Sequence, residues 1–387
     1  MYNFDEKIER KGTSQKWDSP PYNVGDAELT PMWIADMDFA APNCVLDEIK
    51  TRLEHPIMGY FEPEPRFYEC IARWSEKRRG ISGILPQQIL YQNSTVGAIV
   101  STVRLFTKPG QGILVHTPNY TGFQYALSDN NRKLIGSPLI QDERGIFRMD
   151  FADMEKKIRE HSITCMILCS PHNPTGRVWT AEELQQVAAL CERYDIKIIS
   201  DEVWADFVFT PNTHIPTPLI SDYARRNTIS LYGATKTFNL AGLRMAYSIC
   251  FDEVLAGQYK KICNATHYNV PNVLSIAALI GAYSGGEQYV NELLYYIREN
   301  MLFADHFIKE NVPALTSYLP EGTYTLWLKF NKTDRSDDEN MRRMSRLGLV
   351  GDPAHKYNAS GYFRLNVACP KSQVEAALYK LQTVFNS

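Results

Sequence analysis

Short apolar runs rich in β-branched residues alternate with amphipathic segments from about Val45 onward. Between the runs, apolar residues recur at helical spacing, as in TAEELQQVAALCERYD at residues 180–195. Continuous apolar strands that alternate with amphipathic helices are typical of a mostly parallel sheet covered on both faces. We therefore predict an α/β fold built on such a sheet. The strand-like runs lie at residues 89–91, 112–116, 164–169, 196–200 and 228–232.

The pattern differs at the two ends of the chain. The first 45 residues are rich in proline, aspartate and aromatic residues, which predicts an extended arm. After about Tyr283 a long charged helix is followed by strand-like segments at 323–330 and 361–368, which predicts a smaller α+β domain. A chain of 387 residues is longer than a typical domain with a single hydrophobic core. We therefore expect an arm over 1–45, a large domain over 46–283 and a small domain over 284–387.

Composition and charge exclude several classes of protein. The formal net charge is −3 and there is no long run of lysine or arginine, so we expect no nucleic-acid partner. The eight cysteines are scattered without metal-ligand spacing, which favours reduced thiols in the cytoplasm and no metal site. The longest uncharged stretch, residues 262–286, contains asparagine, histidine and proline, which are costly in lipid. We therefore predict no membrane span.

Polar residues follow each of the strand-like runs at the point where the run ends. The segments are QNSTVG, TPNY, SPHNPTG, DE and GATKT, in chain order. In open α/β sheets, ligands bind in the crevice at the carboxyl ends of the strands. The sequence therefore predicts that these five segments converge on one site.

Lys236, Asp201 and Asn173 in these segments match the needs of pyridoxal phosphate (PLP) chemistry. That chemistry needs a lysine for the aldehyde, an anion beside the pyridine nitrogen and donors for the phosphate. Taken alone, each residue has an ordinary alternative. A lysine between threonines is typical of a solvated surface, an aspartate after a strand often caps a helix, and NPTG is a common turn.

Phosphate and ring contacts are predicted from two further segments. STVGA opens a helix at residues 94–98, so the backbone N–H groups of Thr95 and Val96 would face an anion. Tyr120 follows the second strand-like run and could stack on a pyridine ring. A helix cap and a half-buried loop aromatic are the alternatives.

The order of these motifs along the chain resembles fold-type I PLP enzymes, the class I and II aminotransferase superfamily. Four segments are further similar to its C–S lyase branch, the MalY/PatB-like cystathionine β-lyase family. This resemblance implies the fold-type I transferase fold, with a mostly parallel seven-stranded sheet and a smaller α+β domain. The similar segments are TPMWIADMDFAAP (30–42), SPHNPTGRVW (170–179), KTFNLAGL (236–243) and GYFRLNVACP (361–370).

The resemblance also implies residue roles and a homodimer with shared active sites. It assigns Lys236 to the Schiff base, Asp201 to the pyridine nitrogen and Asn173 to the phenolic oxygen of the cofactor. Arg364 would bind the α-carboxylate of an amino-acid substrate. The remaining roles are Tyr120 against the ring, and Thr95, Val96 and Thr235 on the phosphate, joined by Tyr60 from a neighbouring subunit.

Two positions depart from the lyase pattern. Trp204 stands where that branch usually has histidine and aminotransferases usually have tyrosine, and an indole N–H can only donate. Arg244 matches a phosphate-binding arginine of aminotransferases that many lyase-branch sequences lack. The resemblance implies a PLP-dependent C–S β-lyase that cleaves cystathionine or related L-cysteine thioethers. An aminotransferase is the alternative. A non-catalytic regulatory PLP-binding protein is a third hypothesis, although the only segment before the α/β pattern is the arm, which shows no helix-turn-helix module.

Overall fold

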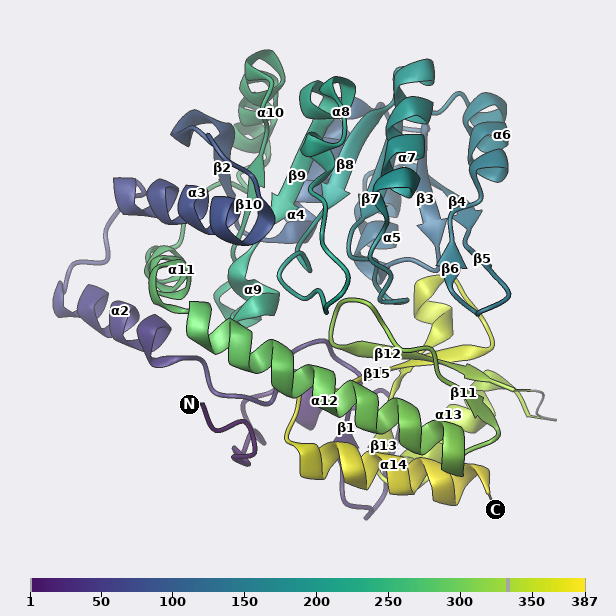
Figure 1. Ribbon diagram of the computed structural model, residues 1–387. Coiled ribbons are helices and arrows are strands. Elements are labelled where there is room, and N and C mark those ends of the chain that lie inside the picture. Colours follow the sequence, from purple (N-terminus) through teal and green to yellow (C-terminus); the bar gives the residue numbers. More distant parts are fainter. Residues whose placement is uncertain (1, 332–334, 387) are drawn as a thin grey trace.

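A seven-stranded, mostly parallel sheet forms the centre of the large domain (Figure 1). The computed structural model describes residues 2–331 and 335–386. Only β10 runs antiparallel to its neighbours in this sheet, so the predicted architecture is confirmed. In spatial order the strands are β2 (Ile89–Gln92), β10 (Ala246–Ile249), β9 (Thr228–Tyr232), β8 (Lys197–Asp201), β7 (Cys165–Cys169), β3 (Gly112–Thr117) and β4 (Lys133–Pro138).

Helices cover both faces of this sheet because its inner strands are apolar on both sides. Alternate residues of β7 enter different cores: Cys165 and Ile167 pack on one face, and Met166 and Leu168 on the other. The first core is completed by α4 (Thr95–Phe106), α5 (Thr121–Ser128) and α10 (Glu253–Thr266). The second is completed by α6 (Phe151–His161) and α7 (Ala181–Tyr194).

The small domain is built on a four-stranded antiparallel sheet. Its strands, in spatial order, are β11 (Leu315–Thr316), β12 (Thr325–Phe330), β15 (Tyr362–Asn366) and β14 (Asp352–Pro353). Its helices are α12 (Glu287–Asn311), α13 (Asp337–Arg346) and α14 (Lys371–Phe385). The long helix α12 crosses beneath the large domain and packs on α14 (Figure 1).

The arm joins the small domain through a short strand, and a buried charge cluster holds the arm itself together. Strand β1 (Thr30–Pro31) pairs in parallel with β13 (Leu349–Val350). Lys16, which is 1% exposed, lies at the start of the arm and pairs with Asp38 at 2.7 Å and Asp36 at 2.9 Å. Arg10 pairs with the same two carboxylates. Four charges that neutralise one another therefore hold two segments of the arm together.

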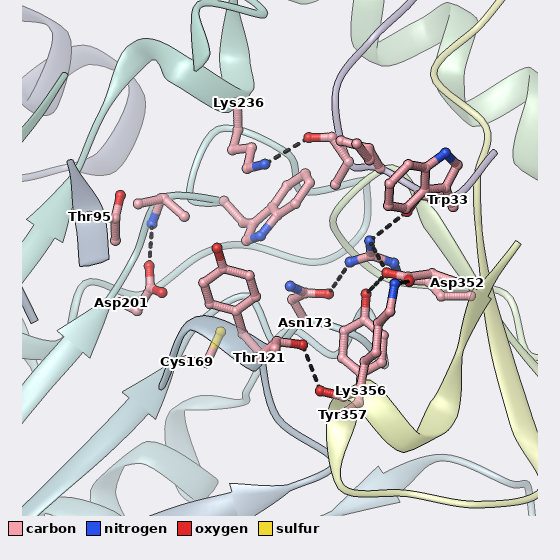
Figure 2. A pocket seen from close by; sticks show the side chains of 16 residues that line it. Trp33, Thr95, Thr121, Cys169, Asn173, Asp201, Lys236, Asp352, Lys356 and Tyr357 are labelled. Atoms are coloured by element: carbon pink, nitrogen blue, oxygen red, sulfur yellow. Dashed lines mark hydrogen bonds and ion pairs between the residues drawn. The ribbon is translucent and has the colours of Figure 1, made fainter. Parts of the chain in front are cut away.

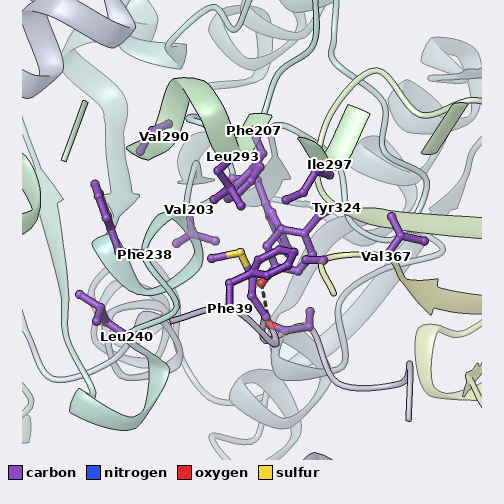
Figure 3. Close-up of a cluster of buried hydrophobic side chains, with 14 of the residues drawn as sticks. Phe39, Val203, Phe207, Phe238, Leu240, Val290, Leu293, Ile297, Tyr324 and Val367 are labelled. Carbon is purple, nitrogen blue, oxygen red and sulfur yellow. Dashed lines mark hydrogen bonds between the residues drawn. The ribbon is translucent and has the colours of Figure 1, made fainter. Parts of the chain in front are cut away.

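A shared apolar core connects the arm and both domains (Figure 3). Phe39 from the arm, Phe207 and Phe238 from the large domain, and Leu293 and Tyr324 from the small domain belong to one buried cluster. The three parts are thus packed together around the cavity described below. The predicted boundaries at residues 45 and 283 stay predictions.

The remaining elements complete the fold, and most of them are short. Among the described residues, no helix has both the length and the apolar character needed to cross a membrane. All eight cysteine thiols are free, and all but Cys44 are buried. The remaining elements are α1 (Gln15–Asp18), α2 (Asn43–Glu54), α3 (Pro65–Arg79), η1 (Pro86–Gln88), β5 (Ile140–Gln141), β6 (Phe147–Arg148), η2 (Thr217–Leu219), α8 (Asp222–Asn227), α9 (Ala234–Thr237), η3 (Ala241–Leu243), α11 (Val273–Gly285) and η4 (Ala354–Tyr357).

Candidate active site

A cavity of about 230 Å³ lies between the strand ends of the large sheet, the arm and the small domain (Figure 2). Seven of the residues predicted for the site line it: Thr95, Tyr120, Asn173, Asp201, Trp204, Lys236 and Arg364. The other lining residues are Trp33, Ile34, Ala35, Thr121, Cys169, Val203, Asp352, Lys356 and Tyr357.

The parallel strands bring the predicted residues together. Asp201 is the last residue of β8, and Lys236 lies in α9, directly after β9. Asn173 follows β7, Tyr120 follows β3, and Thr95 begins α4 after β2. Because the carboxyl ends of parallel strands share one edge of a sheet, side chains far apart in sequence meet there. The predicted convergence of the five segments on one crevice is therefore observed.

Asp201 is a buried carboxylate without a cation at ion-pair distance among the described residues. It accepts a hydrogen bond from the backbone N–H of Val203 at 3.3 Å. Burial raises its pKa to about 6. The neighbouring Glu202 is instead bound by His214 at 2.8 Å and by the Tyr232 hydroxyl at 2.7 Å. Asp201 is thus the carboxylate at this strand end that is left to face a ligand.

Lys236 presents its amino group to the cavity, on the side where the arm closes it (Figure 2). Its Nζ donates to the carbonyl oxygen of Ala35 at 2.7 Å. Burial, with a contribution from the positive charge of Arg364, lowers the pKa of Lys236 to about 8. A lysine with this pKa carries a larger neutral fraction near neutral pH than an exposed lysine does, and only the neutral amine acts as nucleophile or base.

The helix that carries Lys236 is fixed from behind by a buried ion pair. The adjacent Thr237 donates to Asp206 at 2.9 Å, and Asp206 pairs with Arg79 at 2.9 Å. Both charged side chains are 1% exposed. The direction in which α9 presents Lys236 is therefore set by a charged network that does not itself line the cavity.

Trp204 lies in the cavity wall beside Lys236. Its ring meets Tyr324 edge-on, with the ring centroids 4.5 Å apart, and the Lys236 Nζ lies 5.4 Å from the centre of the Trp204 ring. The side chain is 2% exposed. Trp204 therefore shapes the space around the lysine amine through the packing of its ring.

Arg364 is a buried arginine that still has a free donor. Its Nη1 donates to Asn173 Oδ1 at 2.9 Å, and its Nη2 donates to the Trp33 carbonyl oxygen at 3.0 Å and to Asp352 Oδ2 at 3.2 Å. Its Nε has no acceptor among the described residues. Such an unsatisfied buried N–H is costly, and a carboxylate bound in the cavity would satisfy it.

The start of α4 offers unpaired backbone donors. Ser94 caps the helix by accepting from the Gly97 N–H at 3.0 Å. Across the described part of the chain, no protein acceptor is found for the N–H groups of Thr95 and Val96. Thr95 lines the cavity, whereas the half-buried Val96 and Thr235 do not.

Two further predicted residues do not line the cavity and are exposed. Arg244 is exposed and follows η3, and Tyr60 is fully exposed in the single chain, at 109%. Neither side chain lines the cavity, so both roles stay predictions.

Sequence analysis missed the residues that close the cavity from the small-domain side. Asp352, Lys356 and Tyr357 follow one another on β14 and η4, and none carries a recognisable motif. Trp33 lies within TPMWIADMDFAAP, a segment that the resemblance had marked without giving Trp33 a role. The segment is held by Asn366, which donates to the Ile34 carbonyl oxygen at 2.8 Å, and by Tyr324, which donates to that of Ala35 at 2.9 Å.

Comparisons with known proteins agree with this geometry. The family described as "Aminotransferase class I and II" matches residues 30–381. Cystathionine beta-lyase PatB of Bacillus subtilis is 32% identical over 99% of this chain and 100% of its own length. Among solved structures, a PLP-bound protein from Clostridium difficile 630 is 35% identical, with a TM-score of 0.94 and full coverage of both chains.

Cystalysin from Treponema denticola, whose structure contains pyridoxal 5′-phosphate, is 28% identical, with a TM-score of 0.93 over 100% of this chain and 99% of cystalysin. The family match and the fold extend over nearly the whole chain, including every residue of the cavity wall. The chain therefore belongs to the class I and II aminotransferase family.

Proposed function

We propose that the protein is a PLP-dependent C–S lyase that cleaves L-cysteine thioethers, such as cystathionine, to a thiol, pyruvate and ammonia. One observation carries the proposal. Lys236, with a pKa lowered to about 8, shares a cavity with a buried carboxylate that lacks a cation, Asp201, and with the unsatisfied Nε of Arg364. The PatB relative is named a cystathionine beta-lyase, and cystalysin contains the cofactor.

The residues present fit pyridoxal phosphate. A protonated pyridine nitrogen would supply the cation that Asp201 lacks, and the amine of Lys236 would bond to the aldehyde. Because Asn173 already uses Oδ1 to accept from Arg364, its amide N–H₂ is left to donate to the phenolic oxygen. The α4 N–H groups of Thr95 and Val96 would hold the phosphate, together with Thr235. Tyr120 would lie against the ring.

When bound, the cofactor supplies an electron-withdrawing ring that acidifies the Cα–H of an attached amino acid. The side chains then have separate tasks. Arg364 would bind the α-carboxylate and thereby fix the orientation of the substrate at Cα. The neutral amine of Lys236 takes the Cα proton. Trp33 and Tyr357 close the cavity and keep water from the reacting atoms.

Elimination follows from the chemistry of the substrate. Loss of the Cα proton and of the Cβ–S electron pair releases a thiolate, which is a better leaving group than an alkoxide. Water then converts the remaining enamine to pyruvate and ammonia, so no external oxidant or metal is consumed. An aminotransferase is the second candidate because the family match spans residues 30–381 and the first proton transfer is the same. The two differ in where the proton held by Lys236 is delivered.

The assembly and the cellular location belong to the same proposal. We expect a homodimer in which Tyr60 contacts the phosphate bound by the other subunit. This is supported by the 109% exposure of Tyr60 beside the exposed Ile57 and Met58, at 66% and 49%. The free and largely buried thiols favour the cytoplasm.

The test separates elimination from amino transfer. The purified holoenzyme is given L-cystathionine with and without a keto-acid acceptor, and thiol, pyruvate and new amino acid are measured. We expect thiol and pyruvate in equal amounts without an acceptor. Turnover that requires the acceptor and releases no thiol would replace the lyase by the aminotransferase.

A second experiment tests the attachment of the cofactor. Reduction with borohydride, followed by peptide mapping, should place the cofactor on Lys236, and Lys236→Ala should carry no label.

A further inference from the structure

A second cation stands in the cavity wall beside Arg364. Lys356 lies on η4, and its backbone carbonyl oxygen accepts from Thr121 Oγ1 at 2.6 Å and from Gln124 Nε2 at 2.9 Å. These bonds tie η4 to α5 of the large domain. The Lys356 Nζ lies 5.1 Å from the centre of the Trp33 ring (Figure 2). An ammonium group is thus held at the border between the arm and both domains.

One carboxylate serves both cations. Asp352 Oδ1 accepts from Lys356 Nζ at 2.9 Å, and Oδ2 accepts from Arg364 at 3.2 Å and from the Tyr357 hydroxyl at 2.5 Å. The other acidic residue in the cavity wall, Asp201, has the cofactor ring as its proposed partner. Two positive charges therefore share one negative charge at this end of the cavity.

An α-carboxylate bound by Arg364 leaves Lys356 with donors to spare. An ammonium group has three N–H donors, and Asp352 takes one of them. The side chain is 31% exposed, so its flexible stem can move toward a ligand, while the face of the Trp33 ring stabilises the charge by a cation–π contact. A second anionic group on the substrate could accept hydrogen bonds from the remaining N–H donors of Lys356.

We propose that Lys356 binds a carboxylate at the far end of the sulfur substituent, so that the enzyme selects thioethers of L-cysteine that carry a second carboxylate. The inference rests on the proposed lyase function and specifies its substrate class. The alternative is that Lys356 only fastens Asp352 to η4. In that case, removing its charge would affect all thioethers alike.

Three substrates of similar length separate these readings. S-(3-carboxypropyl)-L-cysteine has the distal carboxylate, S-(3-aminopropyl)-L-cysteine has an amine in its place, and S-propyl-L-cysteine has neither. For the wild-type holoenzyme, we expect kcat/KM to be highest for the carboxypropyl compound and lowest for the aminopropyl compound. The quantity measured is the ratio of kcat/KM for the carboxypropyl over the propyl compound.

Lys356→Met keeps most of the apolar stem and removes the charge. We expect the ratio to fall roughly tenfold, which corresponds to about 1.4 kcal/mol. Lys356→Arg should restore most of the ratio. Lys197→Met is the matched control: Lys197 is 33% exposed and pairs with Asp195 at 3.0 Å, compared with 31% and 2.9 Å for Lys356, but it lies outside the cavity. Its ratio should equal that of the wild type.

Binding gives a readout that does not depend on bond cleavage. 2,7-Diaminosuberate, the analogue of cystathionine with CH₂ in place of sulfur, cannot release a thiol. Its inhibition constant should rise roughly tenfold in Lys356→Met, about 1.4 kcal/mol, and that of 2-aminooctanoate should rise less. An equal loss for all three thioethers, or an unchanged ratio, would overturn the role of Lys356. Absence of thiol release from every compound would instead overturn the lyase function, while the two inhibition constants would still test Lys356.

Discussion

The two walls of the cavity are built in different ways. The sheet wall is formed at the carboxyl ends of strands of one mostly parallel sheet, by residues that end a strand or follow it closely: Thr95, Tyr120, Asn173, Asp201 and Lys236. The closing wall (Trp33, Asp352, Lys356, Tyr357 and Arg364) comes from the arm and the small domain. Its members are joined by hydrogen bonds between segments more than 300 residues apart, such as that of Arg364 with Trp33. Under the proposed function this difference becomes a division of labour, in which the sheet wall carries the chemistry and the closing wall recognises the substrate.

Asp201→Asn should have the largest effect, because it removes the anion of the sheet wall. We expect turnover to fall by two to four decades, roughly 2.7–5.5 kcal/mol of transition-state stabilisation, with the cofactor still bound. Steady-state kinetics and the absorbance of the bound cofactor measure the two quantities. Asp195→Asn, at the other end of β8 and outside the cavity, is the control and should behave as wild type. Near-normal turnover in Asp201→Asn would show that the carboxylate only binds the Val203 N–H.

The same substitution should have the opposite effect on the stability of the cofactor-free protein. The pKa of Asp201 is about 6 in the folded chain and near 3.8 in an unfolded one. The folded state therefore holds the extra proton between these values, and stability is lost as the pH rises from about 4 to 6. Asparagine removes this cost, so the variant should be more stable by roughly 3 kcal/mol at pH 8.

Urea unfolding at several pH values and equal protein concentration measures this difference. The gain should shrink as the pH falls through 6 and disappear once the pH is well below the unfolded value of 3.8, because Asp201 is then neutral in both states. A gain that does not change with pH would mean that the buried charge is not its cause.

Arg364→Lys should have a smaller effect, confined to recognition by the closing wall. Lysine keeps the charge but loses the planar fork that binds a carboxylate with two hydrogen bonds. We expect KM to rise about 30-fold, close to 2 kcal/mol, and kcat to fall less. Arg298→Lys, at an arginine that lies on Phe209 outside the cavity, is the control. If kcat fell while KM stayed constant, Arg364 would act in the chemical step and not in substrate binding. The proposed division of roles between the two walls would then be wrong.

The sheet wall could be predicted from sequence because a local pattern marks each member. A polar residue stands where a buried strand ends, as Asp201 does at the end of β8 and Lys236 does after β9. Because parallel strands end at the same edge of the sheet, these residues lie close together. Asp352 and Lys356 could not be found in this way. They follow a strand of only two residues, and their meaning depends on Arg364 and Trp33, which reach them through tertiary packing.

Resemblance to a family closed part of this gap. It identified Arg364 as a site residue, although no sequence pattern predicts its hydrogen bonds to Asn173 and Asp352. It also named Tyr60 and Arg244, which do not line the cavity in the single chain, so their roles await a test on the assembled protein.

The attachment of the arm bears on protein synthesis. Trp33, Ile34 and Asp38 are held by Arg364, Asn366 and Gln373, which follow them by 331, 332 and 335 residues. Contacts between such distant segments form late, and domains fold largely in the order in which they leave the ribosome. The sheet wall can therefore be complete while the closing wall is still being translated. A nascent chain would then pass through a stage at which Lys236 is in place but the residues proposed to select a substrate, Asp352, Lys356 and Arg364, have not yet been made.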